Sequence, residues 1–129
     1  MSRTSASNAS ASGTKSSAPG EYGKVAQWDV YANASAASRA DVPYFVDVQS
    51  DLLRSVPTRF VMPLMRPGRN LSGLPSRMSP QFEVGGIQLL LVPQEAGPID
   101  SRMLKRPVAS LRTESHRIID ALDAVVSGV

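Results

Sequence analysis

The chain has 129 residues, no cysteine, one histidine and a formal net charge of +3. This length predicts one domain, and the lack of cysteine excludes disulfides, thiol nucleophiles and cysteine-ligated metal sites. One histidine cannot form a multi-histidine metal site, and no apolar run approaches the roughly 20 residues that cross a bilayer.

The positive charge is spread unevenly along the chain. Residues 1–24 carry Arg3, Lys15 and Lys24 against Glu21, so residues 25–129 have a net charge of only +1. The body of the protein is therefore nearly neutral, and its charge does not by itself indicate a nucleic-acid partner.

The first 24 residues differ in composition from the rest. Ser2 to Gly20 consists almost entirely of small and polar residues, without an aromatic or β-branched apolar side chain. Such a segment cannot bury enough apolar surface to offset its ordering entropy. We therefore expect residues 1–24 to be a disordered extension and residues 25–129 to be the folded domain.

The first ordered element is predicted as a strand from Val25 to Tyr31. Its residues alternate, with Trp28 and Val30 on one side and Gln27, Asp29 and Tyr31 on the other. Residues 32–41 are small and polar, and we expect them to form a loop.

Two further strands are predicted at residues 44–50 and 59–65, joined by residues 51–58. In the first of these, Tyr44, Val46 and Val48 point to one face of a sheet. Pro63 removes a ladder donor from the second, which is therefore expected to be an edge strand or to be bulged there.

The segment from residue 66 to residue 80 is rich in glycine and proline, so it is predicted as a turn and an irregular connection with one short strand at most. Residues 81–92 form the clearest hairpin, because Gly85-Gly86 suits a two-residue primed turn. That turn pairs Val84 with Ile87 and places the apolar side chains of both strands on one face of the hairpin. This face consists of Phe82, Val84, Ile87, Leu89 and Leu91.

Residues 93–106, which contain Gly97 and Pro98, are predicted as a loop with room for a short helical turn, and residues 107–109 as a brief strand. A C-terminal helix follows, with Thr113 as its N-cap and Gly128 as its glycine stop. One apolar stripe at helical spacing is expected to dock on the sheet. It consists of Ile118, Ile119, Leu122, Val125 and Val126.

Other residues allow chemical interpretations that we weigh against simpler ones. His116 has no partner at defined spacing, so a solvent-facing position is expected rather than a general base. Asp47 and Asp51 are weak evidence for a metal site. Three arginines, Arg66, Arg69 and Arg77, could contact RNA, but such a loop is usually solvated or meets an acidic partner. We predict no catalytic residue, no metal and no cofactor.

The segment Tyr44-Phe45-Val46-Asp47-Val48-Gln49-Ser50-Asp51 resembles the signature strand of the CcdB family, the toxins of type II toxin–antitoxin modules. Three flanking blocks are similar as well and occur in the same order. They are residues 27–31, residues 61–64 and the helix that follows Leu111. The resemblance covers residues 25–129.

The resemblance implies a mainly β fold, an SH3-like β-barrel with a second small sheet and one C-terminal α-helix, assembled as a homodimer. Family toxins are not enzymes: they bind the A subunit of DNA gyrase and trap the cleaved-DNA complex. A cognate CcdA-like antitoxin neutralises them, and operator DNA is bound only through the antitoxin complex. A cytoplasmic location without membrane contact is implied.

The family's gyrase contacts lie in the last three residues and the helix turn before them. By position, these residues are Asp123, Val126, Ser127, Gly128 and Val129. The best-studied members have tryptophan at the position of Ser127, and a large aromatic can dominate an interface. Either the target pocket matches the smaller serine, or this chain poisons gyrase weakly or not at all.

Two other functions stay open. A metal-independent endoribonuclease of the MazF/Kid type is thought to share the barrel, and a decayed toxin would only bind antitoxin. The resemblance also concerns the start of the chain, since family members typically begin near the position of Val25. An internal GTG start codon would be written as valine, so residues 1–24 are predicted to be a mis-assigned extension.

Overall fold

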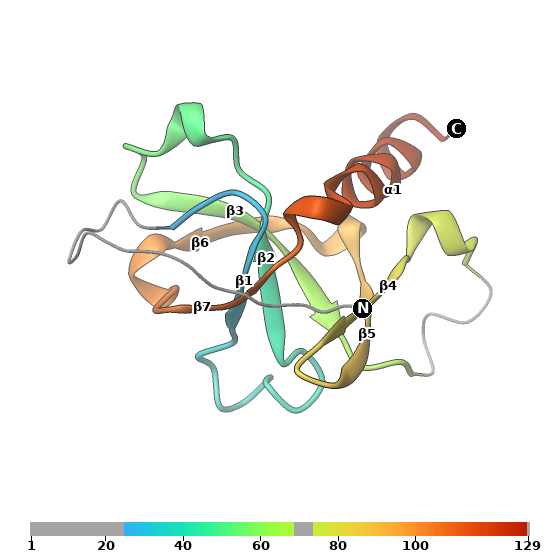
Figure 1. Cartoon of the computed structure of the whole chain (residues 1–129), viewed down its shortest axis with the longest axis horizontal. Helices are drawn as coiled ribbons and strands as arrows, with labels where there is room; N and C mark the ends of the chain where they lie inside the picture. Colours follow the sequence, from blue (N-terminus) through green and yellow to red (C-terminus); the bar gives the residue numbers. More distant parts are fainter. Residues whose placement is uncertain (1–24, 69–73, 129) are drawn as a thin grey trace.

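The computed structural model describes residues 25–68 and 74–128, and its longest strand lies at the centre of a curled antiparallel sheet (Figure 1). Within these residues the elements are β1 (Asp29–Ala32), β2 (Tyr44–Asp47), β3 (Thr58–Met65), β4 (Gln81–Val84), β5 (Ile87–Leu91), β6 (Gly97–Asp100), β7 (Pro107–Ser110) and α1 (Ser115–Ser127). Short 3₁₀ turns occupy Asp51–Leu53, Ser76–Met78, Pro93–Glu95, Ser101–Met103 and Arg112–Glu114.

The strands follow the order β4-β5-β3-β2-β1-β7, and β6 pairs with the first half of β3. The sheet curls into a half-barrel, and α1 packs against the turns at Ser76–Met78 and Pro93–Glu95. The β4–β5 hairpin joins the remaining strands through the end of β3, so the seven strands form one sheet and no separate second sheet among the described residues. The predicted fold class, a mainly β barrel-like domain with a C-terminal helix, is confirmed.

The hairpin has the predicted turn and register. Gly85 and Gly86 adopt φ angles of 60° and 82°, as a two-residue primed turn requires, and Val84 pairs with Ile87. On the solvent-exposed face of the hairpin, the side chain of Gln88 donates a hydrogen bond to the side chain of Glu83 at 3.4 Å. Here the local turn chemistry and the alternating pattern favour the same structure.

The prediction for the strand that contains Pro63 is wrong, because β3 is neither an edge strand nor bulged there. The register with β2 runs without a shift from Tyr44–Leu64 to Asp47–Val61. On the other side, β6 pairs with β3 only as far as Val61, and β5 pairs with it only from Leu64. The Pro63 carbonyl accepts a hydrogen bond from Val92 on that side. Pro63 therefore lies between the part of β3 that pairs with β6 and the part that pairs with β5. No N–H is needed there for a ladder hydrogen bond, so proline is tolerated.

The prediction of a loop at residues 93–106 missed β6. Pro98 lies opposite Phe60, whose N–H is already taken by the side chain of Gln49 on the β2 side. A strand position that makes no ladder bond tolerates proline. Where one short helical turn was expected in this region, the structure has two, at Pro93–Glu95 and Ser101–Met103, and the brief strand predicted at residues 107–109 is β7.

The predicted first strand is shorter than expected and begins at Asp29. Trp28 has a φ of 76°, a left-handed conformation that is uncommon for a large side chain. Its N–H donates to the Asp47 carbonyl at 2.6 Å, and its carbonyl accepts from Leu111 at 2.8 Å. These two bonds fix the chain just before β1 to the end of β2 and to the segment that leads into α1.

The helix begins differently from the prediction. Thr113 is not an N-cap but lies inside the 3₁₀ turn Arg112–Glu114, and α1 starts at Ser115 without a side-chain cap. Arg117 instead anchors the first turn of α1 to its surroundings. Its guanidinium donates to the Glu114 carboxylate and to the Gln81 carbonyl, and it lies 4.3 Å from the centre of the Phe82 ring.

The buried stripe of α1 is also rotated from the predicted one. Ile118, Ala121 and Ala124 are buried, whereas Ile119 is 47% exposed and Val126 is 77% exposed. A stripe chosen by side-chain size overlooks alanine, although alanine lets the helix backbone lie close to the sheet. The glycine stop is confirmed, since Gly128 has a φ of 78°.

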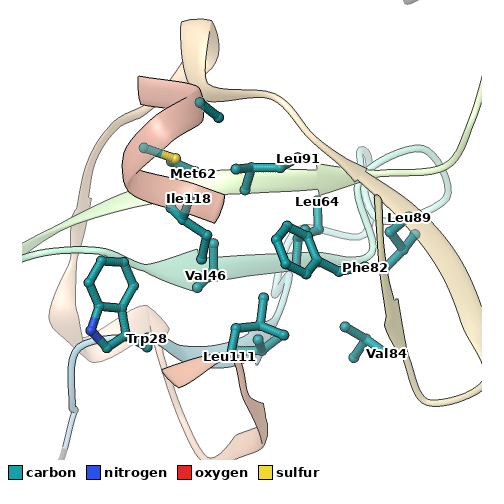
Figure 2. Packing of buried hydrophobic residues seen from close by; sticks show 12 residues of the cluster. Trp28, Val46, Met62, Leu64, Phe82, Val84, Leu89, Leu91, Leu111 and Ile118 are labelled. Atoms are coloured by element: carbon teal, nitrogen blue, oxygen red, sulfur yellow. The ribbon is translucent and has the colours of Figure 1, made fainter. Parts of the chain in front are cut away.

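Two apolar clusters stabilise the half-barrel. The larger lies between the hairpin, the central strands and α1, where Figure 2 shows Phe82, Leu91 and Ile118 directed towards one another. The smaller, on the opposite face of the central strands, contains Tyr31, Val61 and Leu104. Burial raises the pKa of the Tyr31 hydroxyl well above its ordinary value, and the nearby Asp29 carboxylate adds to that rise.

A charged pair is buried beside the central strands. Arg59 and Asp47 are both 0% exposed, and Arg59 Nε donates to Asp47 Oδ2 at 2.8 Å. Burial raises the pKa of the Asp47 carboxyl, and the hydrogen bond from Arg59 opposes that rise. Arg59 Nη1 has no hydrogen-bond partner among the described residues, so the pair is incompletely satisfied.

Candidate binding site at the end of helix α1

The last turn of α1 is a well-defined helix end. The Gly128 N–H donates to the Ala124 carbonyl at 2.9 Å, which is the bond expected when a left-handed residue closes a helix. The Ser127 hydroxyl donates to the Asp123 carbonyl at 2.6 Å. The serine is therefore turned back on its own helix and leaves Val126 as the most exposed apolar side chain of this turn, since Val125 is half-buried.

The predicted site residues share one exposed end of the molecule. Asp123, Val126, Ser127 and Gly128 are all exposed, and Figure 1 shows the end of α1 projecting beyond the strands. Val129 lies outside the described residues. No observation tests whether these residues bind gyrase, so that assignment stays a prediction.

The position of this end is set by the earlier turns of the helix. Ile118 enters the larger apolar cluster (Figure 2), and Ala121 and Ala124 lie buried further along the same face. Arg117 ties the first turn to β4. The exposed turn is therefore the free end of a helix that is anchored over most of its length.

The other candidate residues do not gather at this end. Asp47 accepts hydrogen bonds from Arg59 and from the N–H of Gln49, and Asp51 accepts one from the N–H of Gln27. Within residues 25–68 and 74–128 no group of three or more His, Asp or Glu side chains could hold a metal ion. The structure therefore gives no support to the weak metal interpretation of Asp47 and Asp51.

His116 is exposed near the start of α1, as expected for a solvent-facing residue. Of the three arginines considered for RNA contact, Arg66 and Arg77 are exposed, and Arg66 Nε donates to the Ala40 carbonyl. Arg69 lies outside the described residues.

Sequence reasoning missed one exposed apolar feature. Leu52 is 93% exposed and Leu53 is half exposed in the 3₁₀ turn between β2 and β3. Neighbouring exposed apolar side chains that form a contiguous patch are typical of interaction surfaces, and Val56 in the same loop is exposed as well. The signal was present in the sequence as two leucines between Asp51 and Arg54, outside any alternating pattern.

Taken together, the half-barrel, the single helix among the described residues and its exposed end define a class, the small barrel domains that carry a C-terminal helix. The sequence model of the CcdB family, described as CcdB protein, matches residues 27–128. The chain therefore belongs to the CcdB family, the toxins of toxin–antitoxin modules, and the resemblance predicted from residues 44–51 is confirmed. No curated protein matches the chain. No helix in the described part of the chain is long and apolar enough to cross a membrane.

Proposed function

We propose that this toxin acts by binding the A subunit of DNA gyrase and trapping the enzyme on cleaved DNA, without catalysing a reaction of its own. Family membership supports the target, and the exposed end of α1 supplies a surface for it. The contacting residues would be Asp123, Val126, Ser127, Gly128 and Val129.

The exposure of Val126 carries the proposal. The Val126 side chain is 77% exposed, and its removal from water by a partner would favour binding by about 25 cal/mol per Å² of apolar surface buried. Because α1 is anchored by buried residues, Val126 is presented without a further cost of ordering the helix. A target pocket could therefore be filled by this turn as a preformed unit.

The remaining partners follow from the same proposal. The toxin would act as a homodimer, and a cognate CcdA-like antitoxin would neutralise it by preventing access to the end of α1. Operator DNA would be bound only through the antitoxin complex, which would repress its own operon. Cytoplasmic gyrase would place the site of action in the cytoplasm.

The test compares purified wild-type protein with two variants in a gyrase reaction on supercoiled plasmid, with linear DNA as the readout. Val126→Asp should abolish linear DNA, because a carboxylate would be buried at the interface. Ile119→Asp, a matched change on the same helix at a residue that is also exposed, should retain it. Failure of the wild type to produce linear DNA, or equal activity of all three proteins, would contradict the proposal.

The same preparations should be incubated with messenger RNA without metal ions. Cleavage of RNA by the purified protein would establish the endoribonuclease alternative. If the cognate antitoxin binds but neither DNA nor RNA is cut, the chain is a decayed toxin that retains only antitoxin binding.

A further inference from the structure

We infer that Gln49 is a positioning residue that holds the loop between β2 and β3 in a single conformation, with Leu52 exposed at its tip. Gln49 lies at the base of this loop, residues 50–57, and is buried although its side chain is polar. The hydrogen bonds of its side-chain amide are made to backbone groups.

The side-chain amide of Gln49 bridges three places along the chain. Its nitrogen donates to the carbonyls of Leu53 at 3.2 Å and Thr58 at 3.1 Å. Its oxygen accepts the Phe60 N–H at 2.9 Å. One amide therefore ties the middle of the loop, the first residue of β3 and the strand interior to a single point.

The backbone of Gln49 is itself fixed by the buried charged pair. Its N–H donates to Asp47 Oδ1 at 3.0 Å, and its carbonyl accepts from Arg59 Nη2 at 3.4 Å. Because Asp47 and Arg59 come from the two strands that flank the loop, the pair sets the place of Gln49 relative to both strands. This assigns the buried pair a part in holding the loop.

Other bonds tie the loop to the rest of the chain only near its two ends, where Asp51 accepts the Gln27 N–H at 3.3 Å and the Pro57 carbonyl accepts the Ser101 N–H at 2.9 Å. The middle of the loop has few other means of keeping its shape. Its internal bonds run over three residues, from Leu53 to Ser50, from Arg54 to Asp51 and from Val56 to Leu53. A single isolated turn is not stable in water, since its nucleation cost exceeds what one bond returns. Without the anchor at Gln49, the loop should open while the sheet stays folded.

Hydrogen exchange of individual amides tests this inference in the full chain. Gln49→Met keeps the length of the side chain and removes all three bonds. The amides of Leu53, Arg54 and Val56 should lose protection by about tenfold, as expected for the loss of ordinary hydrogen bonds. The amides of the β4–β5 hairpin should keep theirs, and trypsin should cut faster after Arg54, which is exposed.

Gln88→Met is the matched control, because Gln88 is exposed and its side chain donates a hydrogen bond to the exposed Glu83 carboxylate, away from the loop. It should leave the loop amides unchanged. Unchanged protection of the loop in Gln49→Met, or a loss equal to that of the hairpin, would overturn the inference. So would unprotected loop amides in the wild-type protein.

If Gln49→Met does not fold, Gln49→Glu provides the same test. The glutamate keeps an acceptor for Phe60 but places a carboxylate oxygen against the carbonyls of Leu53 and Thr58. Selective loss of protection in the loop supports the inference, and a uniform loss or no loss overturns it.

Discussion

At the scale of single residues, the buried contact between Asp47 and Arg59 has the largest expected effect on stability. Removing one member of a buried ion pair leaves the other charge without compensation, which typically costs about 3–5 kcal/mol. Arg59→Met should therefore lower the free energy of unfolding by that amount at pH 7, measured by urea denaturation. Gln88→Met should change it by less than about 0.5 kcal/mol.

The loss of unfolding free energy caused by Arg59→Met should be smaller at acidic pH than at pH 7. Without Arg59 only the hydrogen bond from the Gln49 N–H opposes the effect of burial on Asp47, so the pKa of that carboxyl rises further above its unfolded value near 4. A raised native pKa gives stability that is present at low pH and lost as pH rises through it. Adding Asp47→Asn should restore much of the stability at pH 7 and remove the pH dependence, whereas a deficit independent of pH would contradict this explanation.

Tyr31 gives a second pH dependence, at the alkaline end. Its native pKa is raised by burial and by Asp29, so the neutral hydroxyl is favoured in the folded state. Its contribution is complete below the unfolded pKa near 10 and is lost as pH rises above that value. Between pH 9 and pH 11 the wild type should therefore lose more unfolding free energy than Tyr31→Phe. Parallel decreases in the two proteins would show that Tyr31 is not responsible.

Ser127 gives a prediction about binding. Its hydroxyl is bonded to the Asp123 carbonyl of the same helix, and the position is exposed, so a larger side chain fits without a clash. A buried aromatic at an interface is worth about 2 kcal/mol or more. Ser127→Trp should tighten binding to the gyrase A subunit by at least about tenfold. Weaker binding would mean that the target pocket is matched to the serine.

At the scale of elements, substitutions on the buried face of α1 should cost more stability than substitutions on its exposed face. Ala121 is fully buried in the larger apolar cluster, so a larger side chain there should force the helix away from its neighbours. Ala121→Leu is expected to cost about 1–3 kcal/mol of unfolding free energy, measured by urea denaturation. Ile119→Ser on the exposed face should cost less than about 1 kcal/mol. Equal costs would mean that the helix packs by the stripe predicted from the sequence.

Elements were predictable where local chemistry and pattern agree. The hairpin has a glycine pair that demands one turn type and an alternation that demands the same register. β6 was missed because Gly97 and Pro98 are typical of loops, and only the position of Phe60 opposite Pro98 explains why a strand is tolerated. The face of α1 was misjudged because burial of Ala121 depends on how closely the helix approaches the sheet.

The same distinction applies to the sites. The residues at the end of α1 came from a resemblance carried by a short, specific strand, and their exposure agrees with a role in binding. The pair of Asp47 and Arg59 could not be predicted, because residues 12 apart meet only when two strands adopt one register. The role of Gln49 likewise depends on contacts that no pattern encodes.

At the scale of the whole molecule, the half-barrel supports two exposed apolar features at separate places, the end of α1 and the loop between β2 and β3 (Figure 1). Each is fixed by buried residues behind it, Ala121 and Ala124 in one case and Gln49 in the other. A protein that acts by binding needs such preformed surfaces, since ordering them on contact would reduce affinity.

The most direct measurement is the dissociation constant of the purified protein for the isolated gyrase A subunit. Wild type should bind, and Val126→Asp should raise the dissociation constant by at least about thirtyfold, which corresponds to about 2 kcal/mol. Ile119→Asp should stay within about threefold of the wild type. Absence of wild-type binding, or equal constants for the wild type and Val126→Asp, would contradict the account.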